Sequence, residues 1–175
     1  MYYWIALRLN ENYGNNIKSK CKELNKLVLV DEKAFNLPAH ISLKISFESP
    51  INDELKLLNL LLSIVRKYLP LKVTSSHIEL NNNIIWTIFE ENKTLINIHS
   101  KLDEELMKIG VNQHPFDECF IFHSTLFMDE NINKINNMYE LIKHCDVKQE
   151  HILDTIIIGK SNDGINYEVI INEKV

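Results

Sequence analysis

The sequence predicts a single α+β domain made of two similar halves. Two observations carry this prediction. The order strand, helix, strand, helix, strand occurs twice, over about residues 1–80 and 84–172, and the same four-residue pattern recurs in each half. Helices placed between strands that are mostly joined by hairpins are typical of antiparallel sheets with helices on one side. We therefore expect a bilobal duplicated fold over residues 1–175, with two antiparallel sheets, outer helices and a central active-site groove.

Periodicity places the elements of the first half. Apolar residues recur at helical spacing at Ile17, Cys21, Leu24 and Val28. Pro38 favours an extended conformation in the residue before it, so a strand follows directly. In order, we expect a strand over 2–10, a helix over about 16–29, a strand over 40–47, a helix over 50–69 and a strand over 71–80.

Turn residues delimit the elements of the second half. Three asparagines at 81–83 tolerate positive φ and predict a tight hairpin. Gly110 is a helix stop, and Asp163 with Gly164 predicts a turn into the last strand. In order, we expect a strand over 84–90, a helix over 94–109, a strand over 120–128, a helix over 131–144, a long strand over 147–159 and a last strand over 165–172.

The composition limits the class of protein. A net charge of −5 argues against a protein that holds long nucleic acid through many phosphates, so a nucleic-acid ligand would be short or held at one end. The three cysteines are widely spaced, which fits reduced intracellular thiols. Arg8 interrupts the apolar N-terminus, and no run reaches the roughly 20 apolar residues of a membrane span. We expect a soluble cytoplasmic protein.

The repeated pattern reads H-I-S-L at residues 40–43 and H-S-T-L at residues 123–126. The two copies lie 83 residues apart in a chain of 175, which is close to half its length. Each copy lies in a stretch that alternates with the period of a β-strand, so the imidazole and the hydroxyl project from the same face. If a pseudo-twofold relates the halves, the two strands face each other across a cleft. We therefore expect the two patterns to form one site.

This combination of side chains suits the cleavage of a phosphodiester. Two histidines can act as general base and general acid near neutral pH, because their ordinary pKa is about 6.5. We therefore predict that His40 and His123 are catalytic, and the residues do not say which is the acid. The hydroxyls of Ser42 and Thr125 can donate hydrogen bonds to the non-bridging phosphate oxygens. This chemistry needs neither a metal nor another cofactor.

The paired H-x-[ST]-L tetrads resemble the 2H phosphoesterase superfamily. Within it, the chain is similar to bacterial 2'-5' RNA ligase-like proteins and their cyclic-phosphodiesterase relatives, and the order of elements matches over nearly the whole chain. The resemblance implies metal-independent opening of a 2',3'-cyclic phosphate, on an RNA end or a nucleotide, with His40 and His123 as the acid–base pair. It assigns phosphate binding to Ser42 and Thr125. Serine at 42 is a mild departure, since threonine is commoner there.

Strand alternation extends the predicted site by one residue on each strand. Lys44 would add a positive charge to the phosphate site, and Phe127 would line the groove or stack on a base. The alternatives are a solvated lysine and an aromatic residue that caps the core.

Other sites and functions are less well supported. His144, Cys145 and His151 match no familiar zinc spacing, and four glycines are too few for a nucleotide-cradling loop, so ATP-dependent ligation is not expected. The alternatives are a non-catalytic module that binds an RNA or nucleotide phosphate end, and an enzyme for ADP-ribose cyclic phosphate or a 2'-5' oligonucleotide. We expect substrate choice to lie in loops 31–39 and 110–119. No periodic pattern calls for a second subunit, so we expect a monomer.

Overall fold

The computed structural model describes residues 1–31, 34 and 36–175, and the side chains of these residues except 11, 12 and 14–18. The predicted helical position of the Ile17 side chain, and residues 32, 33 and 35 of the predicted substrate loop, therefore lie outside the described residues. In the part of the chain that is described, no helix is both long enough and apolar enough to span a membrane.

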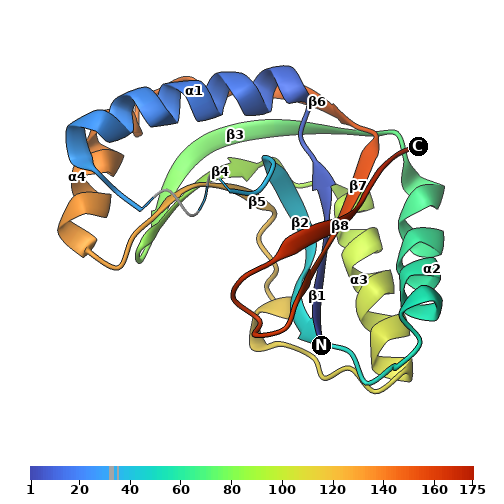
Figure 1. Ribbon diagram of the computed structural model, residues 1–175. Coiled ribbons are helices and arrows are strands. Elements are labelled where there is room, and N and C mark those ends of the chain that lie inside the picture. Colours follow the sequence, from blue (N-terminus) through green and yellow to red (C-terminus); the bar gives the residue numbers. More distant parts are fainter. Residues whose placement is uncertain (32–33, 35) are drawn as a thin grey trace.

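The order of elements is the duplicated one that the sequence predicts, with strand, helix, strand, helix, strand occurring twice (Figure 1). In the first half the elements are β1 (Tyr2–Arg8), α1 (Glu11–Val28), β2 (His40–Glu48), α2 (Glu54–Val65), a 3-10 turn η2 (Arg66–Tyr68) and β3 (Leu71–Asn81). They continue with β4 (Ile84–Phe89), α3 (Lys93–Lys108), a 3-10 turn η3 (Pro115–Asp117), β5 (His123–Met128), α4 (Ile132–Ile142), β6 (Gln149–Leu153), β7 (Thr155–Ser161) and β8 (Glu168–Lys174).

The strands form two four-stranded antiparallel sheets. Sheet A has the order β2-β1-β7-β8, and sheet B has the order β5-β4-β3-β6. The halves of the sequence therefore exchange strands: β3 of the first half pairs in sheet B, while β7 joins β1 in sheet A. The predicted asparagine hairpin joins β3 to β4, with Asn82 at a positive φ of 53°. The predicted α+β fold with two antiparallel sheets is confirmed.

The predicted long strand over residues 147–159 is wrong. The chain leaves sheet B after β6 and enters sheet A with β7, and Asp154 lies between these two strands. Aspartate is disfavoured in strand interiors, and the Thr155 hydroxyl donates a hydrogen bond to its carboxylate at 2.8 Å. Apolar residues continue on both sides of Asp154, which made the stretch look continuous in the sequence.

Helices cover one face of each sheet (Figure 1). In sheet A, Tyr3, Ile5 and Leu7 of β1 belong to the main core with residues of α2 and α3. In sheet B, Ile85 and Phe127 pack with the apolar face of α4 and with the C-terminal part of α1. The other face of β1 carries a small cluster of Trp4, Ala6 and Ile157 with no helix residue in it.

His151 of β6 lies beneath the start of α1 and is buried. Its ring meets the Tyr13 ring edge-on at 4.4 Å, and its Nε2 lies 3.0 Å from the Ser75 hydroxyl. Burial lowers the pKa of this imidazole, because the charged form would lose its hydration. The folded protein therefore holds His151 neutral at a pH where the unfolded chain would protonate it.

We expect this histidine to make folding pH-dependent. Its contribution to stability is complete above its unfolded pKa of about 6.5 and is lost as the pH falls through the lower folded pKa, at no more than about 1.4 kcal/mol per pH unit. His151→Gln should therefore reduce the slope of the unfolding free energy between about pH 7 and 5, measured by urea unfolding. The exposed His144→Gln is the matched control. Equal slopes in wild type and His151→Gln would contradict the assignment.

Candidate active site

The first motif lies on β2, an edge strand of sheet A. His40 pairs with Arg8 of β1 and Ser42 pairs with Ala6, so both motif side chains share the face of Trp4 and Ala6. We call this the motif face of sheet A. Both motif side chains are partly exposed there, so they are accessible to a ligand.

The second motif lies on β5, an edge strand of sheet B. His123 pairs with Ile88 of β4 and Thr125 pairs with Trp86, while Ser124 between them is buried on the opposite face. We call the face with His123 and Thr125 the motif face of sheet B. The edge strands β2 and β5 contact each other (Figure 1). The fold therefore brings together the two strands that carry the motifs.

Each catalytic candidate is held by the same hydrogen bond. His40 Nδ1 lies 2.7 Å from the carbonyl oxygen of Pro38, and His123 Nδ1 lies 2.7 Å from the carbonyl oxygen of Ile121. A carbonyl can only accept, so Nδ1 must donate and carries the proton. In both rings Nε2 is therefore the nitrogen that accepts or releases a proton.

Each imidazole also stacks on a tryptophan. The Trp4 and His40 ring centroids are 4.8 Å apart, and those of Trp86 and His123 are 4.0 Å apart. An indole face orients the ring and attracts it more strongly when it is protonated, by about 0.5–1 kcal/mol at exposed sites. The two stacks therefore support an acid–base role, since one imidazole must be charged during the reaction.

The two tryptophans reach their histidines differently. Trp86 lies opposite Thr125, and the corresponding residue opposite Ser42 is Ala6. Trp4 lies two residues before Ala6 on β1, and its indole reaches the His40 ring across the small Ala6 side chain. On its other side the Trp4 indole covers Gly159 of β7, where an added Cβ would lie 2.1 Å from Trp4 Nε1. Ala6 and Gly159 thus make room for the Trp4–His40 stack.

The protonation of His123 depends on burial. Burial lowers its pKa, and the hydrogen bond to the Ile121 carbonyl opposes this in part. His123 is therefore mainly neutral at neutral pH, with Nε2 ready to accept a proton.

The predictions that Lys44 and Phe127 lie beside the motif side chains are wrong. A β-bulge interrupts the β1–β2 pairing between Ser42 and Lys44, and a second one interrupts the β4–β5 pairing between Thr125 and Phe127. A bulge adds one residue to a strand and shifts the following side chains to the other face. Lys44 is 1% exposed and Phe127 is 0% exposed. Both are buried on the helix-covered faces.

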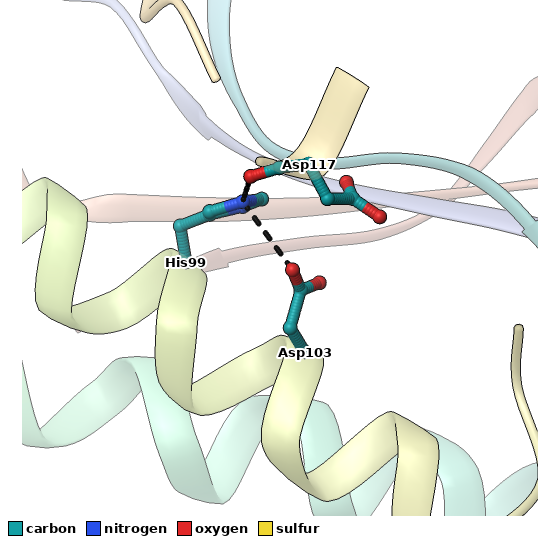
Figure 2. A group of neighbouring side chains, drawn as sticks. All are labelled: His99, Asp103 and Asp117. Atoms are coloured by element: carbon teal, nitrogen blue, oxygen red, sulfur yellow. Dashed lines mark hydrogen bonds and ion pairs between the residues drawn. The ribbon is translucent and has the colours of Figure 1, made fainter. Parts of the chain in front are cut away.

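Lys44 forms a buried ion cluster in place of a phosphate contact. Its ammonium lies 2.7 Å from Asp103 Oδ1 and also pairs with Asp117 Oδ2. Asp103 belongs to α3, and Asp117 ends the turn η3 shortly before the second motif strand. Figure 2 shows these two aspartates around His99 of α3. We call Lys44, His99, Asp103 and Asp117 the buried ion cluster.

His99 is the fourth member of this cluster. Its Nδ1 lies 2.8 Å from the Leu43 carbonyl oxygen. Its Nε2 lies 3.2 Å from the Asp117 carbonyl oxygen and 3.4 Å from Asp103 Oδ2 (Figure 2). Both ring nitrogens therefore face oxygen atoms, and the Phe120 ring stacks on the imidazole at 4.2 Å. His99 thus links α3 to β2 and to the segment before β5.

The same cluster has the donor set of a metal site, since His99, Asp103 and Asp117 each offer a ligand atom within 4.8 Å of the others. The Lys44 ammonium contacts both carboxylates, however, and already supplies their counter-charge. A divalent cation would have to displace it. We therefore interpret the cluster as a structural link between β2, α3 and the segment that leads to β5.

Comparisons with known proteins show the fold. No protein-family model and no curated protein sequence matches the chain. Among solved structures, LigT of Escherichia coli in complex with 3'-AMP is similar, with a TM-score of 0.63 and 15% identity over 99% of this chain and 97% of that one. A phosphoesterase is similar with a TM-score of 0.58 and 14% identity, over 99% and 97% of the two chains. LigT in complex with ATP gives a TM-score of 0.56 and 13% identity, over the same shares.

Sequence reasoning missed the residues that support the motifs. Trp4 and Trp86 lie 82 residues apart, close to the 83-residue offset of the two motifs, which suggests that they occupy equivalent positions in the two halves. The strand pairing shows instead that Trp86 and Ala6 are the equivalent residues, since each lies opposite the hydroxyl residue of its motif. The signal that could have found them was simpler: both tryptophans of the chain lie in the strand that precedes a motif strand.

We expect Gly159→Ala to destabilise the protein through Trp4. The added methyl group would overlap the indole, and overpacking of this kind typically costs about 1–3 kcal/mol. Urea unfolding would measure the cost in wild type and in a Trp4→Leu background, where the indole is absent. A cost that is equal in both backgrounds would contradict the contact.

Lys44→Met should be strongly destabilising. It leaves the Asp103 and Asp117 carboxylates buried without their cation, and breaking a buried ion pair in this way costs on the order of 3–5 kcal/mol. The same denaturation assay applied to Lys56→Met, on the surface of α2, is the control. A cost below about 1 kcal/mol for Lys44→Met would show that the carboxylates do not depend on the lysine.

Proposed function

We propose that this chain is a 2H phosphoesterase that opens 2',3'-cyclic phosphates without a metal. The observation that carries the proposal is the pair of H-x-[ST] motifs on two contacting edge strands, each with its histidine fixed by a Nδ1–carbonyl hydrogen bond and an indole. The fold of LigT, whose solved complexes contain 3'-AMP and ATP, supports a nucleotide ligand. One domain acting as a monomer in the cytoplasm is enough for this reaction.

The proposed reaction is the hydrolysis of one P–O bond. A neutral imidazole takes a proton from water through Nε2 as the water oxygen attacks phosphorus. A protonated imidazole on the opposite side gives its Nε2 proton to the departing ribose oxygen. One water is consumed, one ring P–O bond breaks, and the product is a phosphomonoester, at the 2' position by the pattern of the family. The hydroxyls of Ser42 and Thr125 hold the non-bridging oxygens.

The lowered pKa of His123 agrees with the role of general base. At neutral pH this imidazole is mainly neutral and can accept the proton of water at once. His40 would then be the general acid, and the Trp4 face would stabilise its charged form. This assignment gives the two halves of the duplicated site different tasks.

The central test uses 2',3'-cyclic nucleotides in the presence of EDTA. Wild type should convert them to phosphomonoesters, and His40→Ala and His123→Ala should each lose about 10²–10⁴-fold in kcat, because each removes one proton-transfer group. The exposed His144→Ala is the matched control and should keep full activity. Rates would be followed by separating substrate from product, and circular dichroism would verify folding.

The outcomes separate the alternatives. Full turnover in both His40→Ala and His123→Ala would reject the mechanism. Tight binding of a cyclic nucleotide without product would identify a non-catalytic module for phosphate ends. Turnover of ADP-ribose cyclic phosphate or of a 2'-5' oligonucleotide, with cyclic nucleotides untouched, would keep the site and change the substrate.

A further inference from the structure

Tyr167 lies over the motif face of sheet A, just before β8. Its ring packs against the cluster of Trp4, Ala6 and Ile157 that occupies this face. The residues on either side of it in the sequence, at positions 166 and 168, are exposed, whereas Tyr167 is partly buried. Tyr167 is therefore the residue of this segment that turns inward, and the reaction proposed above gives it no task.

The Tyr167 ring contacts the indole that supports His40. The Tyr167 and Trp4 ring centroids are 6.3 Å apart at an interplanar angle of 75°, which is the edge-to-face arrangement that aromatic pairs favour. The same indole stacks on the His40 ring at 4.8 Å, covers Gly159 and is 5% exposed. A displacement of the Tyr167 ring would therefore reach His40 through a single side chain.

The Tyr167 hydroxyl ties this ring to the first motif strand. It forms a hydrogen bond with the hydroxyl of Ser46, which lies four residues beyond Ser42 on β2. The next residue, Phe47, belongs to the main core on the helix-covered face, so alternation directs Ser46 to the motif face. The Tyr167 ring is thus held at two points, by the indole and by the strand that carries His40 and Ser42.

The turn before Tyr167 is fixed by its own hydrogen bonds. The Asp163 carboxylate accepts hydrogen bonds from the backbone N–H groups of Asn166 and Ile165 and from the Ser161 hydroxyl. The bonds from Asn166 and Ile165 hold the pKa of this carboxyl well below its ordinary range, so it stays charged at neutral pH. The predicted turn into the last strand therefore sets the place where the Tyr167 ring enters the motif face.

We propose that Tyr167 is a positioning residue for His40 and acts through Trp4. The indole can orient the imidazole only while the indole itself does not tilt, and Tyr167, restrained by Ser46, prevents the tilt. The inference rests on the proposed function, in which Nε2 of His40 must lie within hydrogen-bond reach of the departing ribose oxygen. Misplacing a reacting group by about 1 Å costs on the order of 10²-fold in rate, so a small tilt has a large effect.

Proton NMR of the histidine rings tests this positioning without turnover. The ring current of Trp4 displaces the resonances of the carbon-bound ring protons of His40, and Trp86 does the same for His123. His40→Ala and His123→Ala assign the two sets of signals. Trp4→Leu gives the position of the His40 signals when the stack is absent. The His123 signals are the internal reference, because Tyr167 contacts side chains of sheet A.

Three variants alter the support of the indole. Tyr167→Leu should move the His40 signals towards their position in Trp4→Leu and leave the His123 signals in place. Tyr167→Phe and Ser46→Ala keep the aromatic ring and remove the hydrogen bond, so they should move the His40 signals in the same direction by less. Tyr68→Phe is the matched control, because its ring packs on the helix side of sheet A, and it should change neither set of signals.

Steady-state kinetics with a 2',3'-cyclic nucleotide separate positioning from a purely structural role. Tyr167→Leu should lower kcat by about 10- to 100-fold at a nearly constant KM, because His40 is misplaced while Ser42 and Thr125 still hold the phosphate. Tyr167→Phe and Ser46→Ala should each lose about two- to tenfold, the range for one hydrogen bond. The double variant should lose no more than either single one, because both substitutions remove the same bond.

The two readouts together decide the inference. Unchanged His40 signals in Tyr167→Leu, displaced signals with an unchanged kcat, or a loss that lies entirely in KM would overturn it. If circular dichroism shows that Tyr167→Leu does not fold, Tyr167→Phe and Ser46→Ala decide by the same readouts. Failure of the proposed function looks different, because wild type would not hydrolyse the nucleotide, and the signals alone would then show whether Tyr167 holds the His40 ring. Full turnover in every Tyr167 variant would overturn the inference and leave the proposed function intact.

Discussion

The buried ion cluster connects the two halves of the candidate site. Lys44 follows the first motif on β2, Asp103 and His99 lie on α3, and Asp117 precedes the second motif on β5. Desolvating these groups is costly, so each charge is stable only while its partners stay in place. Displacing β2 relative to the segment before β5 would leave a charge unpaired. The two edge strands that carry the motifs are thereby restrained in one relative position.

The β-bulges allow the same strands to carry both the exposed motif side chains and the buried anchoring side chains. In an uninterrupted strand Lys44 would project from the same face as His40 and Ser42, and it would then be exposed beside them. The bulge after Ser42 directs the lysine into the core instead, and the carbonyl of Leu43 at the bulge accepts a hydrogen bond from His99. In the second motif strand, a bulge between Thr125 and Phe127 likewise directs Phe127 into the core. Each strand therefore places its motif on one face and an anchoring side chain on the other.

The β-bulges explain which parts of the site could be predicted from the sequence and which could not. The fold class and the motif faces follow from local periodicity, and His40, Ser42, His123 and Thr125 are found where alternation puts them. A bulge leaves no mark in the alternation, because either register of β2 puts plausible residues on each face. The prediction therefore failed one step beyond each motif. The change of sheet between β6 and β7 was also hidden, since it occurs at a single residue, Asp154, inside an apolar stretch.

The strand pairing also shows which residues make the two sides of the candidate site different. Lys44 and Phe127 differ in charge, but both are buried, so they cannot distinguish two sides of a ligand. The residues paired with the two catalytic candidates can, since His40 lies opposite Arg8 and His123 lies opposite Ile88. Sheet A therefore presents a cation beside its histidine, and sheet B presents an apolar side chain next to Trp86.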